Sequence, residues 1–369
     1  MKFGFIDIVY AYTADRPEQN EPLGGTTSAI CFLARALTTQ GIECTFFNRI
    51  NTPKVCHGIQ SLPLSSLSDV SLYSDYSCFI FCGRWMNDIV QWVRVNTSVP
   101  LIAWMHESIF TPPLTTALDA FDAVVFVSHW QQSINQKEIR PHWQQHVIHN
   151  AMNPLAAELI LSRETRSRKK TKPPCLLYAG SFARGAFHIA PILDRLRSYN
   201  SDFTIDVFCS TTPSGHEKSD QDYIEWLRRQ QNVTHVGLVG QTQLMHLMEQ
   251  ASIMVAPNPW PETSCIAMIE AMATGLKVIS TNRAALPETA SGFATLIEID
   301  DPDNPHRFDA PINYEIFAQK IASVLDVLKT DPISFEDEQN QQTKYFLNNY
   351  QWYQRVDTWV NFIEILRQT

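Results

Sequence analysis

The chain has 369 residues, of which 44% are hydrophobic and 18% charged, and its formal net charge is −9. This length exceeds one ordinary domain and fits two, and the composition is that of a globular protein rather than a disordered or fibrous one. The negative charge disfavours a general nucleic-acid binder, because such proteins neutralise phosphates with a basic face.

Short apolar runs alternate with helix-length segments through the first half of the chain. The apolar runs are residues 3–10, 44–50, 78–83, 101–106, 123–128 and 146–150, and residues 26–40 form the first helix-like segment. This alternation predicts a parallel sheet covered by helices. We assign residues 1–160 to a first Rossmann-like domain.

A basic stretch then interrupts the pattern. Residues 163–172 are rich in lysine and arginine and end at Pro173 and Pro174, so we interpret residues 161–175 as a solvated linker. A patch that faces acidic lipid, and so gives peripheral membrane contact, is the alternative.

The alternation restarts after the linker. Apolar runs recur at residues 176–181, 204–210, 233–237, 253–257 and 277–282, with helical segments at 189–199, 223–229 and 244–251. We therefore predict an α/β fold of two doubly wound Rossmann-like domains, the second over residues 176–345, facing a central cleft. Ligands of open α/β sheets bind at the carboxyl ends of the strands, which makes that cleft the expected site.

The last segment, residues 346–369, has the spacing of an apolar helix face. Its pattern is carried by Tyr350, Tyr353, Val356, Trp359, Val360 and Ile363. We expect a core-packing helix here, and packing against the first domain is one arrangement that the periodicity leaves open.

Eight cysteines are scattered along the chain without metal-ligand spacing. Four of them, Cys78, Cys82, Cys175 and Cys209, fall in or beside apolar runs, which is typical of reduced core thiols. No apolar stretch of about 20 residues and no cleavage signal is present. These features predict a cytoplasmic protein, with the cytoplasmic face of a membrane as the location if the basic stretch binds lipid.

Residues 253–281 carry the most informative pattern. A buried strand leads through a proline loop into a helix, for which Thr263 or Ser264 is a suitable N-cap. The first amides of such a helix favour a phosphate. Glu262 stands just before the helix and Glu270 eight residues later, about 12 Å along a helix axis.

Spacing alone does not identify a site. Glu217 and Glu225 have the same interval without a strand or proline loop before them. By spacing alone, a carboxylate at a helix start and a surface carboxylate are favoured over ligand contacts for Glu262 and Glu270.

The whole segment P-x2-W-P-E-T-S-x5-E-A-M-A-x-G-x-x-V-I strongly resembles the donor motif of family 4 glycosyltransferases, which are retaining enzymes of the GT-B fold. The resemblance implies that Glu262 holds hydroxyls of the donor sugar and Glu270 those of the ribose. It also implies that the amides of Thr263, Ser264, Cys265 and Ile266 reach the diphosphate.

Two segments of the first half extend the resemblance. Gly24 and Gly25, between the first strand and its helix, are similar to the family's glycine loop, where a missing Cβ lets the backbone approach phosphates and acceptor. A lone Gly-Gly pair is otherwise a common turn. His106 ends the strand-like run 101–106, and the resemblance implies that it contacts the transferred sugar without abstracting a proton.

The segment from Tyr178 to Gly185 resembles the part that supplies cations to the leaving diphosphate, with one departure. Many members have arginine after the first glycine, where this chain has Ser181. Arg184 is kept and should carry more of the charge stabilisation, with Lys218 or Arg283 as candidates for a second cation. The resemblance also implies that the backbone near Val239 binds the nucleobase.

Three patterns suggest a metal but lack support. His142, His146 and His149 have no cysteine or carboxylate set nearby, and the pairs Asp220/Asp222 and Asp301/Asp303 fall at a helix start and in a loop. We expect no metal and no cofactor.

The resemblance implies a hexosyltransferase, with the acceptor bound by the first domain and the donor by the second, and the lack of a metal-ligand set predicts that it is metal-independent. UDP-glucose or UDP-N-acetylglucosamine is the expected donor, and a glycan or lipid-linked glycan of polysaccharide or cell-envelope biosynthesis the acceptor. Ser181 supports an alternative, a catalytically silent subunit that binds nucleotide sugars. A phosphorylase or a sugar epimerase is a further alternative; the former needs a pyridoxal lysine, for which no context is seen.

Overall fold

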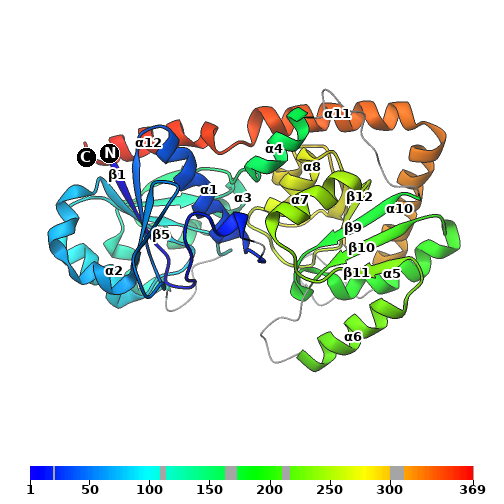
Figure 1. Cartoon of the computed structure of the whole chain (residues 1–369), viewed down its shortest axis with the longest axis horizontal. Coiled ribbons are helices and arrows are strands. Elements are labelled where there is room, and N and C mark those ends of the chain that lie inside the picture. Colours follow the sequence, from blue (N-terminus) through cyan, green and yellow to red (C-terminus); the bar gives the residue numbers. More distant parts are fainter. Residues whose placement is uncertain (20, 109–113, 163–172, 210–216, 300–310, 369) are drawn as a thin grey trace. The chain divides into compact units, whose positions relative to one another are not determined.

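A computed structural model describes residues 1–19, 21–108, 114–162, 173–209, 217–299 and 311–368. The chain divides into two compact units. The first consists of residues 1–19, 23–153 and 350–369, and the second of residues 20–22 and 154–349. Figure 1 shows that each unit has a sheet with helices packed against it.

The first unit is built on a sheet with the strand order β3-β4-β2-β1-β5-β6-β7-β8. Its strands are β1 (Lys2–Ile6), β2 (Glu43–Asn48), β3 (Lys54–Cys56), β4 (Ile59–Pro63), β5 (Cys78–Cys82), β6 (Leu101–Trp104), β7 (Ala123–Phe126) and β8 (Gln144–Val147). All neighbours pair in parallel except β3 and β4. The predicted parallel sheet is thus confirmed, with an added antiparallel strand at this edge, where His57 and Gly58 adopt positive φ and turn the chain back.

Helices cover both faces of this sheet. They are η1 (Arg16–Glu18), α1 (Gly25–Thr39), η2 (Leu64–Ser68), η3 (Val70–Asp75), α2 (Asn87–Asn96), η4 (Leu114–Ala120), α3 (His129–Ile134), η5 (Gln136–Glu138) and α12 (Tyr353–Leu366). One core lies between the sheet and α2, where Val90 and Val93 are fully buried beside Phe79. Trp104 of β6 packs edge to face on Trp359 of α12, with 5.2 Å between ring centroids.

The second unit is built on a sheet with the order β11-β10-β9-β12-β13-β14, parallel throughout its described strands. The strands are β9 (Cys175–Ala179), β10 (Thr204–Phe208), β11 (Val233–His235), β12 (Ile253–Ala256), β13 (Lys277–Thr281) and β14 (Thr295–Ile297). Continuous burial along β12 explains why this strand is an unbroken apolar run in the sequence.

The helices of the second unit are α4 (Pro154–Leu161), η7 (Phe182–Arg184), α5 (Ala186–Tyr199), α6 (Glu217–Arg229), α7 (Gln241–Gln250), α8 (Ile266–Ala273), α9 (Leu286–Ala290), α10 (Pro311–Thr330) and α11 (Pro332–Asn349). Helices α5 and α10 lie side by side (Figure 1) and share a core with β9, β10, β12 and β13. Helix α4 packs on α7 and α8, so the second unit begins at Pro154 and not after residue 160. The basic stretch 163–172 lies outside the described residues.

The end of the chain differs from the predicted single helix. Helix α11 ends at Asn349, and α12 begins at Tyr353 and belongs to the first unit. Val356, Trp359 and Ile363 are buried as the periodicity predicts, but Tyr353 is 55% exposed. Tyr350 is also buried and Val360 partly so, and the apolar spacing is wrong at Tyr353, which lies in the first turn of the new helix.

The eight cysteines are free thiols, and the four in or beside apolar runs are buried. Burial raises the pKa of the Cys175 thiol to about 12. None of the described helices combines the length and apolarity that spanning a membrane requires.

Candidate functional site

The site residues of the second unit gather where the strand order reverses. Strand β9 has β10 on one side and β12 on the other, so the loops that leave β9 and β12 flank the switch point at the carboxyl edge, where ligands of open α/β sheets bind. The first loop carries Arg184, at the end of η7, and the second carries Glu262. Arg184 and Glu262 are 78 positions apart in the sequence and meet here.

The contact between them is an ion pair from Arg184 Nη1 to Glu262 Oε1. The Arg184 side chain is 37% exposed and that of Glu262 15%. The guanidinium also lies over the ring of Trp260, 5.3 Å from its centroid. Arg184 is thus held in place while one side remains open to a ligand.

Asn258 also holds the carboxylate of Glu262 in place. The sequence did not reveal this role. Its Nδ2 donates to Glu262 Oε1 at 2.9 Å, and its Oδ1 accepts from Trp260 N at 2.9 Å. Thr281 Oγ1 donates to the Asn258 carbonyl at 2.7 Å. Both contacts that the carboxylate makes with described side chains use Oε1, so Oε2 can accept hydrogen bonds from hydroxyls.

Close packing brings the two loops together. Gly185 has a φ of 112°, and a Cβ at this residue would lie 2.2 Å from the carbonyl oxygen of Pro257. Only glycine permits this approach without moving the backbone. The glycine that follows Arg184 therefore sets the distance between the arginine loop and the glutamate loop.

Helix α8 begins later than predicted. Its N-cap is Cys265, with no side-chain cap, so the assignment of Thr263 or Ser264 as N-cap is wrong. The chain from Glu262 to Ser264 instead follows the loop, which is anchored by a bond from Ala285 N to the Glu262 carbonyl at 3.0 Å. The first amides of α8 have no acceptor within the helix, as at any helix N-terminus. In α8 these amides begin with that of Ile266.

Glu270 lies within α8 and is only 3% exposed. The alternative that Glu270 is a surface carboxylate is therefore wrong. Burial also raises the pKa of the neighbouring Cys265 thiol to about 12, so this thiol is protonated and is not a nucleophile at neutral pH.

The other predicted residues of this unit lie around the same edge. Val239 follows the outer strand β11, in the loop before α7. Ser181 caps η7, and its carbonyl accepts from Tyr178 Oη at 2.8 Å. Arg283 follows β13 and is half-buried, whereas the Lys218 side chain lies outside the described part.

The site residues of the first unit also gather at a switch point. Strand β1 has β2 and β5 on its two sides. Gly24 is the N-cap of α1 and Gly25 its first residue. A Cβ added to Gly24 would meet nothing within 4 Å, so there is open space beside this backbone.

His106 reaches the same place from the end of β6. A Cβ at Gly83, which follows β5, would lie 3.3 Å from Thr26 Cγ2 and 3.9 Å from His106 Cβ. The sequence did not single out Gly83 or Thr26. They bring the start of α1 and His106 together at one edge of the sheet.

His106 is neutral at physiological pH. Its ring packs on Trp104, with 4.6 Å between centroids, and burial lowers the pKa of His106 to about 3. An imidazole with so low a pKa still exchanges hydrogen bonds with hydroxyls but is a weak base and therefore a poor proton acceptor. This agrees with a role in sugar contact.

The lowered pKa of His106 predicts a pH-dependent stability. The unfolded state binds a proton near pH 6.5 and the folded state only near pH 3, so the free energy of unfolding falls as pH drops through this window. At pH 5 this lowers the free energy of unfolding by at most roughly 2 kcal/mol. Urea denaturation of wild type and His106→Gln at pH 7.5 and 5 should show a smaller loss in the variant. Equal losses would contradict a neutral His106.

Of the three histidines weighed as metal ligands, His142 and His146 contact other groups of the first unit, whereas the ring of His149 lies beside that of His129, with 5.7 Å between their centroids. His142 Nε2 lies 3.1 Å from the Phe121 carbonyl oxygen, and His146 stacks on Phe362 at 5.2 Å. Asp222 is exposed, while Asp301 and Asp303 lie outside the described residues and the Asp220 side chain is not described.

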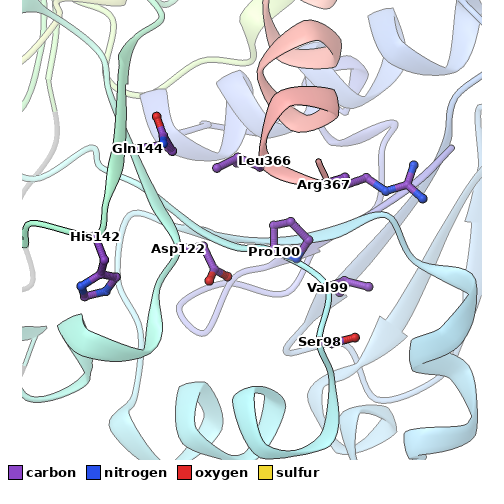
Figure 2. Close-up of a pocket in the computed structure, with 8 residues that line it drawn as sticks. All are labelled: Ser98, Val99, Pro100, Asp122, His142, Gln144, Leu366 and Arg367. Carbon is purple, nitrogen blue, oxygen red and sulfur yellow. The ribbon is translucent and has the colours of Figure 1, made fainter. Parts of the chain in front are cut away.

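A pocket of about 610 Å³ in the first unit, shown in Figure 2, is lined by none of the candidate site residues. It is lined by Ser98, Val99, Pro100, Asp122, His142, Gln144, Leu366 and Arg367. Pro100 and Asp122 directly precede β6 and β7, so this pocket is at the amino edge of the sheet, opposite His106. Asp122 is engaged by Arg94 Nη1 and Leu101 N, both at 2.8 Å. The pocket therefore belongs to a different face from the candidate site.

Comparison with known proteins identifies the architecture. Residues 174–324 match the family model described as Glycosyl transferases group 1. A glycosyltransferase from Rickettsia africae ESF-5 superposes with a TM-score of 0.71 at 15% identity, covering 99% of this chain and 98% of that one. The chain has the GT-B fold of glycosyltransferases.

Two further GT-B structures are similar to this chain over its full length. Sucrose-phosphate synthase from Thermosynechococcus elongatus gives a TM-score of 0.66 at 14% identity, covering 100% and 98% of the two chains. Anabaena HepE in complex with UDP-glucose gives 0.63 at 14% identity, covering 98% and 99%. No curated protein matches this chain in sequence. The family match includes Arg184, Glu262 and Glu270.

Proposed function

We propose that this GT-B protein is a glycosyltransferase that moves a hexose from a nucleotide sugar to a glycan or lipid-linked glycan, with retention of anomeric configuration. UDP-glucose or UDP-N-acetylglucosamine is the donor, and no metal is required. The second unit binds the donor and the first the acceptor, in polysaccharide or cell-envelope biosynthesis at a cytoplasmic location. HepE, which has the same fold, was solved with UDP-glucose.

The observation that carries the proposal is the meeting of Arg184 and Glu262 at the strand-order reversal of the second sheet. Departure of a nucleoside diphosphate increases negative charge on the phosphate oxygens. Arg184 and the first amides of α8 stabilise that charge where a metal does so in other enzymes. Glu262 orients the sugar through Oε2, while Glu270 accepts hydrogen bonds from the ribose.

His106 contributes a neutral hydrogen-bonding group on the acceptor side, next to the backbone of Gly24 and Gly25. With its pKa near 3, His106 does not take the acceptor proton. The leaving phosphate takes it instead. The acceptor oxygen forms the new glycosidic bond as the bond between the sugar and the diphosphate breaks.

The test is binding followed by turnover. Thermal unfolding is measured with UDP, GDP and ADP and their glucose conjugates, because a ligand at 100 times its dissociation constant adds about 2.7 kcal/mol of stability. We expect UDP and UDP-sugars to stabilise most. Release of UDP from the best donor should then be unchanged by EDTA. A loss of turnover that Mn2+ restores would refute metal independence.

Binding without release of UDP in the presence of any glycan would support the silent subunit that Ser181 suggests. Stabilisation by none of the nucleotides would contradict both functions. The two readouts therefore separate an enzyme from a binding protein.

A further inference from the structure

A second pocket of the first unit has no role in the chemistry above. It has a volume of about 490 Å³ and is lined by Asn48, Arg49, Ile50, Asn51, Pro63, Leu64 and Ser65. These residues end and follow β2 and end β4, which run parallel to β1. The pocket therefore opens at the same edge of the sheet as His106.

Its lining contains a guanidinium, two amide side chains and a hydroxyl, but no carboxylate. Arg49 is exposed and forms no ion pair with an acidic side chain among the residues that the structure describes. In a chain with a net charge of −9, a cation placed in a pocket free of acidic side chains is a specific feature. Guanidinium, amide and hydroxyl groups all donate hydrogen bonds, and an oxyanion accepts them.

The pocket is built before any ligand arrives. Arg49 Nε donates to the Ile8 carbonyl, and Arg49 N donates to the Tyr10 carbonyl at 3.2 Å. Buried Asn48 donates through Nδ2 to the Tyr12 carbonyl at 2.8 Å and accepts from Ile50 N at 3.1 Å. These bonds fix the start of the guanidinium and leave its terminal N–H groups to a ligand, which lowers the entropy cost of binding.

Asp7, a carboxylate that interacts with Arg49, does not compete for this position. Asp7 interacts electrostatically with Arg49, but Asp7 is 2% exposed and accepts from Val9 N at 2.8 Å. It is not part of the pocket lining. Asp7 thus lowers the net charge felt at Arg49 without blocking access to it.

The place of the pocket in the sheet sets its distance from His106. Strand β2 is separated from β6 by β1 and β5, which is three strand spacings. At about 4.8 Å per spacing, the pocket is roughly 14 Å from the end of β6. This exceeds the width of one sugar ring.

We infer that the Arg49 pocket binds an oxyanion of the acceptor, a carboxylate or a phosphate, on a residue beyond the sugar that receives the hexose. The inference rests on the proposed function in making the ligand an acceptor. The affinity of the pocket for an oxyanion does not depend on the proposed function. The acceptor is accordingly an acidic glycan or one joined to a phosphate.

Binding is measured first, without turnover. Full-length protein labelled with 15N-arginine is titrated with inorganic phosphate, glucuronate and, as the neutral control, glucose. The Arg49 Nε–H signal is assigned by its loss in Arg49→Gln. We expect phosphate or glucuronate to shift this signal and glucose to leave it unchanged, and the anion that shifts it more identifies the acceptor group.

Arg367 is the matched control, because it is an exposed arginine at the opposite edge of the same sheet. An equal shift of its signal would mean unspecific charge pairing and overturn the inference, as would no shift of Arg49 with either anion. Asn51→Asp places a carboxylate in the pocket while Arg49 stays. This variant should weaken the anion response about fivefold, since an exposed charge pair contributes roughly 1 kcal/mol at most.

The kinetic arm then tests the link to the acceptor. Arg49→Gln should raise KM for acidic acceptors about fivefold and leave kcat, the affinity for UDP and transfer to neutral acceptors unchanged. Arg367→Gln should change none of these. An unchanged KM with acidic acceptors would overturn the acceptor role, whereas absence of transfer in wild type would refute the proposed function and leave the anion response intact.

Discussion

Arg184→Ala should lower turnover with the nucleotide sugar about 100-fold or more while the affinity for free UDP changes by less than about tenfold. The difference arises because negative charge grows on the leaving diphosphate only as the glycosidic bond breaks, and a preorganised cation stabilises that state most. Arg184 is already held by Glu262 and the Trp260 ring, so it needs little rearrangement to act. Calorimetry with UDP and a UDP-release assay measure the two quantities.

Two variants control this experiment. Arg197→Ala removes the same charge from α5 of the same unit, where Arg197 is paired with Asp194, and should leave turnover unchanged. Arg184→Lys keeps the charge but loses the planar fork, and should recover part of the activity. Wild-type turnover in Arg184→Ala would mean that another cation, such as Arg283, stabilises the diphosphate.

Glu262→Gln and Glu270→Gln should have opposite effects on binding and turnover. Glu270→Gln should weaken both UDP and the UDP-sugar about ten- to 150-fold, because both contain the ribose and a charge-assisted hydrogen bond contributes about 1.5 to 3 kcal/mol. Glu262→Gln should leave UDP affinity within a few-fold of wild type but abolish turnover, since the sugar loses its orientation. Glutamine preserves side-chain volume, which matters for the buried Glu270.

Glu225→Gln is the matched control for both glutamates. Glu225 belongs to the second pair with the same sequence interval, and it lies exposed on α6 in an ion pair with Arg229. It should behave as wild type in calorimetry and transfer. If Glu262→Gln abolished UDP binding and Glu270→Gln spared it, the proposed orientation of the donor would be reversed.

Asn258 illustrates what a linear motif omits. It lies inside the pattern that resembles the donor motif, yet nothing in the pattern shows that its amide holds Glu262 Oε1. That contact needs the bend at Trp260, where the backbone N–H bonds back to Asn258 Oδ1. A loop conformation set by tertiary packing is not encoded in residue spacing.

The prediction of the N-cap of α8 is wrong for the same reason. Thr263 and Ser264 are good capping residues, and local preference favours them at a helix start. The bond from Ala285 N to the Glu262 carbonyl and the close contact between Gly185 and Pro257 keep the loop extended as far as Cys265. Tertiary contacts outweighed a local preference of about 1 kcal/mol.

By itself, the sequence determined that the chain forms two α/β units, because unbroken apolar runs followed by helix-length segments fit only buried parallel strands. Its resemblance to family 4 glycosyltransferases also pointed to Arg184, Glu262 and Glu270, and the end of a strand-like run pointed to His106. Only the tertiary structure decided that Arg184 pairs with Glu262, that His106 is neutral and that α4 belongs to the second unit. These outcomes depend on burial and on contacts between residues far apart in the sequence. Periodicity carries information about one element at a time, whereas a pKa or an ion pair depends on several elements at once.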